Sequence, residues 1–404
     1  MLYKNNKKEF SDELFKNPTA EYRAAPFWAW NTTLSKELLT EQIEYLKEMG
    51  FGGFHIHSRA GMSTEYLSDK FMTLVSACVE KAKKENMLAY LYDEDRWPSG
   101  TAGGSVTKNP ENRAKYLCFT PEKADSVSPG TGRKTGEPYL LACYDVILSE
   151  HGRISSYRKI GAEDACKGEK WYAYVKTPKP SGWYNNQTYV DTMSRGATDE
   201  FIRATHERYN KFVGNEFNKT IPSIFTDEPN MPKKNTFENA FSKQEVTIAW
   251  TTDFPETFSK AYNMDITDAL PELFWESEDC TPSRIRYLYH DHTCERFTEA
   301  FIDTCGKWCE KHNLIFTGHL LKESTLEKQT AELGDAMRSY RSFTIPGIDI
   351  LCDNIEYATV KQAQSVSRQF GREGLMAELY GVTGWAFDFR GHKFQGDWLA
   401  ALGV

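Results

Sequence analysis

The sequence lacks the cysteine patterns of disulfide-stabilised and zinc-finger proteins. Its nine cysteines are scattered and odd in number, and no CxxC pair occurs. Cys305 and Cys309 stand in a stretch with a helical pattern, where their spacing is poor for zinc. The first residues, MLYKNNKKEFSDELF, contain no apolar signal core. These absences predict reduced cysteines and a cytoplasmic protein.

Long apolar runs and an excess of positive charge are also missing. No stretch approaches the roughly 18 uninterrupted apolar residues of a membrane-spanning helix, so we expect no membrane partner. The formal net charge of −8 argues against nucleic acid or an anionic membrane as the main partner. The segment GTAGG (100–104) lacks both the G-x-G-x-x-G pattern and a Walker lysine, which argues against a nucleotide-binding loop.

Apolar and aromatic side chains, in contrast, are abundant. Apolar residues make up 40% of the 404 residues, which is enough for a large core. Aromatic residues make up 14%, including ten tryptophans and twenty-one tyrosines. Aromatic faces suit the rings of a carbohydrate substrate, although large cores also use them.

Short apolar runs alternate with amphipathic helical patterns along most of the chain. The first part has a βαβαβ rhythm, which indicates parallel strands joined by crossover helices. The rhythm resumes later, and the seven expected strands are 25–31, 52–58, 87–94, 221–228, 314–320, 347–353 and 375–381. We therefore expect an α/β fold, namely a (β/α)8 TIM-type barrel that lacks its eighth strand in this chain.

The rhythm breaks after the third strand, where strand-like segments separated by Gly, Pro and Ser predict an antiparallel β insertion. The expected division is a first part of the barrel at 1–104, the β-rich insertion at 105–196, and a second part of the barrel at 197–404. A long helical region is expected after the fourth strand. Seven strands leave two open edges, at the first and the seventh strand, so we expect one of three arrangements. The N-terminal segment or a neighbouring chain fills the gap, the first and seventh strands are drawn together, or the chains self-associate through the open edge.

The carboxyl ends of the expected strands carry polar and aromatic side chains. A single charge after a strand is more often part of a solvated loop, but in barrels of this type the chemistry lies at these ends. Seven such ends in succession predict one shared pocket. The residues expected to bind substrate there are Trp30, Asn31, His55, His57, Arg59, Asp93, Asp95, Arg96, Trp97, Asp227, His319, Glu323, Asp353 and Tyr380.

The segment YLYDEDRWPSG (90–100) places three successive acids after the third strand. Because side chains alternate along a strand, Asp93 and Asp95 would share one side and Glu94 would oppose them. Not all three acids can therefore face a substrate. One or two of them could instead pair with Arg96 or Arg59.

Glu228 and Glu378 form the candidate catalytic pair. Cleavage of a glycosidic bond needs one protonated acid for the leaving oxygen and one carboxylate that acts as nucleophile or as base. Burial and neighbouring charges must separate the pKa values of the two groups. The ends of strands four and seven lie roughly across the mouth of a barrel, which leaves room for a sugar between them. Asp227 is a rival for the role of Glu228, which could also act like an N-cap before Pro229.

The HIH segment at 55–57 allows two further interpretations of the chain. Two histidines at i and i+2 share a face of a strand and could bind zinc, as in a metal-dependent hydrolase. However, the fourth strand offers no lysine and the sixth no histidine, so hydrogen bonds from His55 and His57 to substrate hydroxyls or carboxylates are favoured over a metal. A non-catalytic or truncated sugar-binding barrel is the remaining alternative.

Several segments together resemble one family. PFWAWN, GFGGFHIHSRAGM, YLYDEDRWPSGTAGG, IFTDEP and AELYGVTGW are similar to the barrel of glycoside hydrolase family 106, the α-L-rhamnosidases and their bacterial relatives. This resemblance, over about residues 22–404, implies an exo-acting glycoside hydrolase on polysaccharide side chains, with calcium near the site in some members. It also implies Glu228 as the general acid and Glu378 as the second carboxylate, either a base under inversion or a nucleophile under retention.

Overall fold

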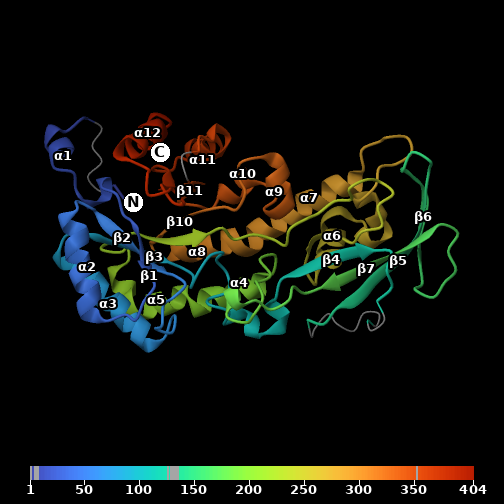
Figure 1. The fold of residues 1–404 in the computed structure, drawn as a ribbon, viewed down its shortest axis with the longest axis horizontal. Coiled ribbons are helices and arrows are strands. Elements are labelled where there is room, and N and C mark those ends of the chain that lie inside the picture. Colours follow the sequence, from blue (N-terminus) through green and yellow to red (C-terminus); the bar gives the residue numbers. More distant parts are fainter. Residues whose placement is uncertain (1, 4–8, 125–126, 128–135, 352–353) are drawn as a thin grey trace.

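Seven parallel strands form the larger sheet of the protein. In the computed structural model, the described residues are 2–3, 9–124, 127, 136–351 and 354–404. The strand order is β1-β2-β3-β8-β10-β11-β12, and helices pack against the sheet, which gives a TIM-like half-barrel (Figure 1). The strands are β1 (Phe27–Trp30), β2 (Gly53–Ser58), β3 (Leu88–Tyr92), β8 (Ser223–Asp227), β10 (Ile315–His319), β11 (Ile345–Ile350) and β12 (Met376–Leu379). The expected fold class is confirmed.

Alternation along the strands separates the outer, helix-facing side of the sheet from its inner side. Phe54 of β2 packs on Trp28, whose indole donates a hydrogen bond to Gln42 of a covering helix. His57, three residues after Phe54 on the same strand, points to the opposite side of the sheet and stacks on Phe27, with 4.9 Å between the ring centroids. Apolar side chains therefore anchor the sheet to the helices, while polar and aromatic side chains line the inside.

The helices begin at residues that suit helix starts. Ser35 accepts a hydrogen bond from the backbone of Leu38, and Ser68 accepts one from Phe71, as N-caps do. The helices of the half-barrel are α2 (Lys36–Glu48), α3 (Asp69–Lys84), α4 (Arg195–Ala204), α5 (His206–Val213), α7 (Arg284–Phe297), α8 (Asp303–Lys311), α9 (Leu326–Glu332), α10 (Ala336–Tyr340), α11 (Tyr357–Gln369) and α12 (Phe389–Ala401). The short α1 (Asp12–Lys16) precedes β1, and α6 (Phe254–Tyr262) accompanies the second sheet.

The second sheet is antiparallel and lies at the other end of the elongated molecule (Figure 1). Its order is β6-β5-β7-β4-β9, with β4 (Lys115–Thr120), β5 (Tyr139–Leu148), β6 (Ile154–Ile160), β7 (Glu169–Lys176) and β9 (Val246–Trp250). Four of the strands follow β3, as the sequence predicts. The fifth, β9, lies after β8, in the region expected to be helical, and pairs with β4. That expectation was therefore wrong in part, because VTIAW is a short β-branched and aromatic run that completes the sheet.

The two edges of the half-barrel are β1 and β12, which the described pairings do not join. Part of the N-terminal segment lies near both edges at the amino-terminal end of the sheet. The backbone of Leu2 donates to the carboxylate of Glu373, shortly before β12, and Tyr3 packs on Tyr22, shortly before β1. Residues 2–3 thus connect the two sides, although they pair with neither strand. Self-association through the open edge remains a prediction.

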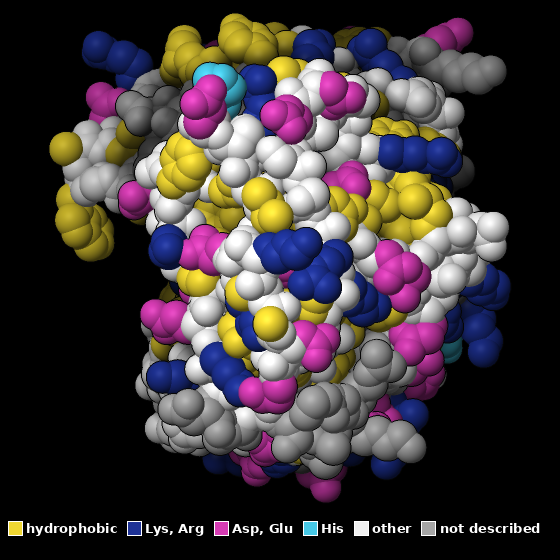
Figure 2. Space-filling model, turned by 90° about the vertical axis from the view of Figure 1, so that its right-hand side faces the viewer, with side chains coloured by type: hydrophobic (Ala, Val, Ile, Leu, Met, Phe, Trp, Pro, Cys, Tyr) yellow, Lys and Arg dark blue, Asp and Glu magenta, His cyan; other side chains and the backbone are white. Residues whose placement is uncertain are grey.

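The described surface charge and the cysteines do not point to a particular class of binding partner. The end of the molecule that carries the antiparallel sheet mixes Lys and Arg with Asp and Glu, so neither sign dominates that face (Figure 2). Within the described ranges, we find no helix with the length and apolar character needed to cross a membrane. The described cysteines are free thiols.

Candidate active site

A buried ion pair lies at the centre of the candidate site. Asp227, the last residue of β8, accepts a hydrogen bond from His319 at the end of β10, with 2.9 Å between Oδ1 and Nε2. Its other oxygen accepts a 2.5 Å hydrogen bond from the hydroxyl of Tyr92 on β3. Burial alone would lower the pKa of His319, but the hydrogen bond and charge of Asp227, together with the charges of Glu378 and Asp349, outweigh burial and hold the pKa well above its usual value. A fixed imidazolium–carboxylate pair therefore occupies the carboxyl end of the sheet.

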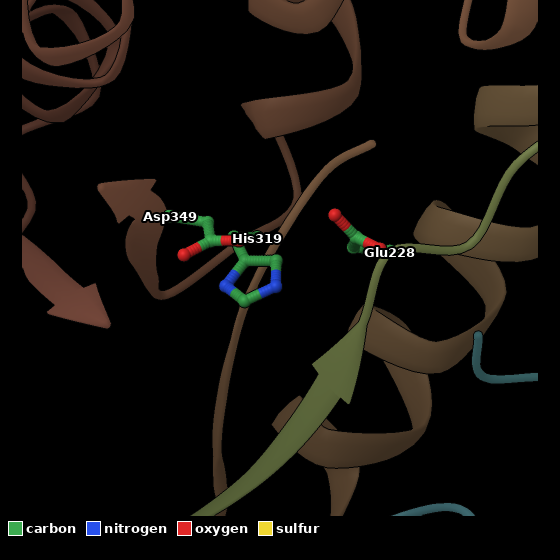
Figure 3. Close-up of side chains that lie close together, drawn as sticks. All are labelled: Glu228, His319 and Asp349. Carbon is green, nitrogen blue, oxygen red and sulfur yellow. The ribbon is translucent and has the colours of Figure 1, made fainter. Parts of the chain in front are cut away.

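Three more carboxyl groups surround the imidazole of His319. Ligand atoms of Glu228, His319 and Asp349 all lie within 4.8 Å of one another, and the ring lies between the two carboxyls in Figure 3. Glu378 lies on β12, the strand next to β11, and its Oε2 is 3.7 Å from Nδ1 of His319. Nδ1 of His319 and Oδ1 of Asp349 are buried without a hydrogen-bond partner among the described residues. These two atoms therefore have unfilled hydrogen-bonding capacity, although neither is exposed to solvent.

The environment raises the pKa values of both candidate catalytic glutamates. Burial raises the pKa of Glu228 to about 7, with Asp227 and Asp349 adding to the shift and His319 opposing it. Burial likewise raises the pKa of Glu378 to about 8, again against the influence of His319. Because the carboxyls repel one another as anions, the cluster retains protons near neutral pH. It can therefore supply a protonated acid beside an ionised carboxylate, as proton transfer requires.

Glu323 lies behind this cluster. The hydroxyl of Tyr340 donates a 3.3 Å hydrogen bond to its Oε1, and the side chain is buried. Burial raises the pKa of Glu323 to about 8, and the charges of Asp349 and Glu228 add to the shift. Gln329 and Gln362 hold the backbone carbonyl of Glu323 in place.

We expect Glu323→Gln to stabilise the protein at pH 8. The folded protein holds a proton on Glu323 that the unfolded chain releases, so the free energy of unfolding falls as pH rises from about 4.5 to about 8. Glutamine removes this cost, which we expect to amount to roughly 1–3 kcal/mol at pH 8 and to be small at pH 5. Thermal unfolding at both pH values, with the exposed Glu327→Gln as control, measures the effect. The same pH dependence in Glu323→Gln and the wild type would contradict it.

The two histidines of β2 lie deeper and are neutral. His55 stacks on Tyr90 and His57 meets Tyr92 edge to face, with ring centroids 4.7 and 4.1 Å apart. Burial lowers the pKa of His55 to about 4 and that of His57 to about 3. Nδ1 of His55 and Nε2 of His57 have no hydrogen-bond partner among the described residues. Neither histidine belongs to the group of potential metal-ligating residues found in the described part of the chain.

Asp93 follows the end of β3 and is turned toward the helical layer. It is fully buried, and the thiols of Cys305 and Cys309 are close enough to feel its charge. Its Oδ1 accepts a 2.6 Å hydrogen bond from the hydroxyl of Ser99, and the same hydroxyl oxygen accepts one from the backbone of Asp227. Asp93 therefore supports the site through Ser99.

Glu94 organises the loop that follows. Its carboxylate is buried and accepts five backbone hydrogen bonds of 2.6–3.0 Å, from Asp95, Gly100, Thr101, Ala102 and Gly103. The glycine-rich segment thus wraps around a carboxylate of the chain itself. Positive φ angles at Gly100, Ala102 and Gly103 allow the amides to converge.

Asp95, Arg96 and Trp97 connect the barrel to the insertion. Arg96 contacts Oδ2 of Asp95 through two nitrogens, at 2.8 and 3.1 Å, and also donates to Asn185 of the insertion. The indole of Trp183 donates to the backbone carbonyl of Trp97, and the two partly exposed rings meet edge to face. The acid of this group is thus paired, and the exposed surface is aromatic.

The other expected substrate-binding residues are scattered. Trp30 is buried on the outer side of the sheet against Phe71, away from the acidic cluster. Asn31 is exposed after β1, and Arg59 follows β2 close enough to His57 to influence its charge. The hydroxyl of Tyr380 donates to the backbone of α12. Asp353 lies outside the described residues. The structure thus groups Asp227, Glu228, His319, Glu323 and Glu378, with His55 and His57 on the same inner face.

Asp349 and Tyr92 belong to the cluster but were not among the expected site residues. β11 spans Ile345–Ile350, so the strand ends earlier than expected and Asp349 faces inward from it. A signal was present, because a single acid between Ile348 and Ile350 in a strand must face away from the helices that cover the isoleucines. No comparable signal marked Tyr92, whose partner Asp227 is remote in sequence.

The residues of this cluster do not fit a calcium ion. Calcium usually takes six to eight oxygen ligands. Glu228 and Asp349 offer carboxylate oxygens, but the third member of the group, His319, offers a nitrogen, which calcium disfavours. We therefore treat the cluster as a proton-transfer site and route no step through a metal.

The fold resembles that of a solved rhamnosidase structure. A rhamnosidase from Novosphingobium sp. PP1Y matches over 98% of this chain and 56% of its own, with a TM-score of 0.67 and 14% sequence identity. The catalytic domain of a β-amylase from Paenibacillus polymyxa matches over 94% of this chain and 92% of its own, with a TM-score of 0.47 and 10% identity. No family model and no curated protein matches the sequence. The chain thus spans little more than half of the rhamnosidase, with which it shares its fold.

Proposed function

We propose that this protein is a glycoside hydrolase. The observation that carries the proposal is the pair Glu228 and Glu378, two carboxyls with raised pKa values that both lie beside the imidazole of His319. Such a pair meets the basic requirement of glycosidic cleavage, a proton donor and a second carboxylate at one bond. The fold shared with a rhamnosidase supports this assignment.

In this proposal, Glu228 donates its proton to the leaving oxygen, as the resemblance of IFTDEP to family 106 implies. Glu378 either activates a water molecule or attacks the anomeric carbon. Roughly 5–5.5 Å between the two carboxyl groups in a substrate complex corresponds to retention, and roughly 6.5–9.5 Å to inversion. The imidazolium of His319 stabilises whichever neighbouring carboxyl ionises during the reaction, while the negative charge of its partner Asp227 offsets part of this effect.

The proposed substrate is a sugar at the end of a polysaccharide side chain, with α-L-rhamnose the first candidate. The similar structure is named a rhamnosidase, and the sequence motifs resemble α-L-rhamnosidases. Nδ1 of His319 and Oδ1 of Asp349 offer unfilled hydrogen-bonding capacity for sugar hydroxyls. Trp97 and Trp183 offer partly exposed aromatic faces on the insertion side.

We expect a narrow, bell-shaped pH profile of kcat/KM. One carboxyl must be ionised and the other protonated, and the pKa values of about 7 for Glu228 and about 8 for Glu378 define that window. Because Glu228 has the lower pKa, the productive form, with Glu228 protonated and Glu378 ionised, is the minor one of the two singly protonated forms in the free protein. Activity should rise with pH as the first proton leaves the pair near pH 7, and fall as the second leaves near pH 8. Initial rates on an aryl glycoside between pH 5 and 10 measure both limbs. A rate already at its plateau at pH 5 would show that these two carboxyls are not the titrating pair.

The first experiment is a screen of aryl glycosides, including an α-L-rhamnoside, for release of the phenol. Hydrolysis of at least one glycoside supports the proposal. A metal-dependent hydrolase would instead contain stoichiometric zinc bound at His55 and His57 and lose its activity when the zinc is removed. A sugar-binding barrel would bind a sugar without cleaving any glycoside. Metal analysis of the purified protein and a binding titration with the same sugars separate these outcomes.

A further inference from the structure

A small cavity lies between the antiparallel sheet and helix α7, and none of the candidate catalytic residues lines it. Its volume is about 50 Å³. Apolar walls come from the β9 strand and the segments around it, through Phe237, Ile248, Leu273, Phe274 and Tyr289. Three basic side chains, Lys234, Arg286 and His290, complete the lining together with Asn235 and Thr236.

The basic side chains are close together and lack acidic partners. Nζ of Lys234 is 3.3 Å from Nε2 of His290. One nitrogen of Arg286 donates to the backbone carbonyls of Glu272 and Trp275, at 3.2 and 3.0 Å, while its Nε is buried without a partner. Throughout the described part of the chain, we find no carboxylate in an ion pair with any of the three. Their positive charge is therefore uncompensated within the fold.

The acids nearest to this group are engaged elsewhere. Asp291, next to His290 on α7, binds the side chains of Arg338 and Tyr262. The carboxylate of Glu272 accepts hydrogen bonds from the hydroxyls of Tyr157 and Ser283. Neither acid can turn to the cavity without losing these partners, so these two acids offer the basic group no counter-charge.

The pKa values of Lys234 and His290 show that burying these basic groups together is unfavourable. Burial, followed by the charge of Arg286, lowers the pKa of Lys234. Burial, followed by the charges of Lys234 and Arg286, lowers the pKa of His290 to about 4. Half-buried cations that repel one another destabilise a fold unless an anion joins them, because desolvation is then repaid by direct attraction.

We propose that this cavity binds a small oxyanion, a carboxylate or an inorganic phosphate or sulfate, between Lys234 and Arg286. A cavity of about 50 Å³ has room for such a group but not for a sugar ring. The guanidinium of Arg286 and the ammonium of Lys234 supply charged donors, and the neutral imidazole of His290 can add an uncharged N–H. The apolar and aromatic walls lower the local dielectric, which strengthens the attraction. The inference is independent of the glycosidase proposal.

The test compares two adjacent lysines in the full chain. Sodium phosphate and sodium acetate are titrated at constant ionic strength, with chloride as the reference, and followed by calorimetry and by the unfolding temperature. Lys234→Met is expected to raise the dissociation constant at least tenfold. Lys233→Met, which removes an exposed charge one residue away, is expected to leave it unchanged. Without added oxyanion, Lys234→Met should unfold at the same or a higher temperature than the wild type, because it relieves repulsion.

The outcomes distinguish the sources of the oxyanion. Tighter binding of acetate indicates a carboxylate as the natural ligand, and tighter binding of phosphate indicates a free inorganic ion; both support the proposal. Lys234→Gln, which keeps a polar end but removes the charge, should lose binding as Lys234→Met does, so the result does not depend on one variant. No binding of either anion to the wild type, or equal losses in the Lys233 and Lys234 variants, would overturn the proposal.

Discussion

Glu228→Gln and Glu378→Gln are each expected to lower kcat by about 10²–10⁴-fold or more on an aryl glycoside. Each substitution removes one of the two proton-handling groups at the bond that breaks. The fold should be unchanged, because the raised pKa values already favour neutral forms of both side chains, which glutamine resembles. Steady-state rates and thermal unfolding of both variants measure the two effects separately.

Further substrates and a nucleophile distinguish the two roles. If Glu228 is the proton donor, Glu228→Gln should retain most of its rate on substrates whose leaving group needs no proton, such as a dinitrophenyl glycoside. If Glu378 is the second carboxylate, azide should restore turnover in Glu378→Ala and give a glycosyl azide. The reverse pattern would exchange the roles. The exposed Glu327→Gln is the control, and an unaltered rate in either active-site variant would remove that residue from the pair.

Glu94→Gln is expected to destabilise the protein by roughly 3–5 kcal/mol. The carboxylate of Glu94 accepts five backbone hydrogen bonds in a buried loop. A glutamine amide presents an N–H group to these donors, so several backbone amides lose their partner. Urea denaturation of the wild type and the variant gives the difference in the free energy of unfolding.

The neighbouring Asp95→Asn is the matched control for that experiment. The side chain of Asp95 is also buried, but it accepts hydrogen bonds from only two side chains, Arg96 and Asn185, and asparagine keeps one acceptor oxygen, so its substitution should cost about 1–2 kcal/mol. Equal effects of the two substitutions would show that Glu94 does not organise the loop. Glu94→Gln should also lower activity, since the loop carries Ser99, which bonds to the backbone of Asp227.

The architecture of the barrel was predictable because its signals are periodic and local. Each strand is a short apolar run, and each helix that follows has an apolar stripe and, in cases such as Ser35 and Ser68, a capping serine. Strand β9 was missed because five residues after a long loop carry almost no period of their own. Only pairing with β4, more than a hundred residues away in sequence, makes this segment a strand.

The candidate site was predictable in position more than in detail. The sequence has acids at the carboxyl ends of the expected strands, and parallel strands bring these ends together. This pattern indicated Asp227, Glu228 and Glu378. The acids at 93–95 do not project freely into the mouth, because β3 ends at Tyr92 and the chain then turns. Alternation along a strand no longer applies beyond that point. The directions of the side chains at 93–95 depend on which backbone amides and arginines lie nearby in the folded protein, and a single sequence does not reveal these neighbours.

The most direct test of the account is the hydrolysis of aryl glycosides by this protein, followed by NMR of the sugar as it is released. The account predicts that at least one glycoside is cleaved, that the first sugar released has a single anomeric configuration, and that both Glu228→Gln and Glu378→Gln lose this activity. Release of sugar at the wild-type rate by both variants would contradict it. Failure of the protein to cleave any glycoside, while it hydrolyses an amide or ester with zinc bound at His55 and His57, would contradict it equally.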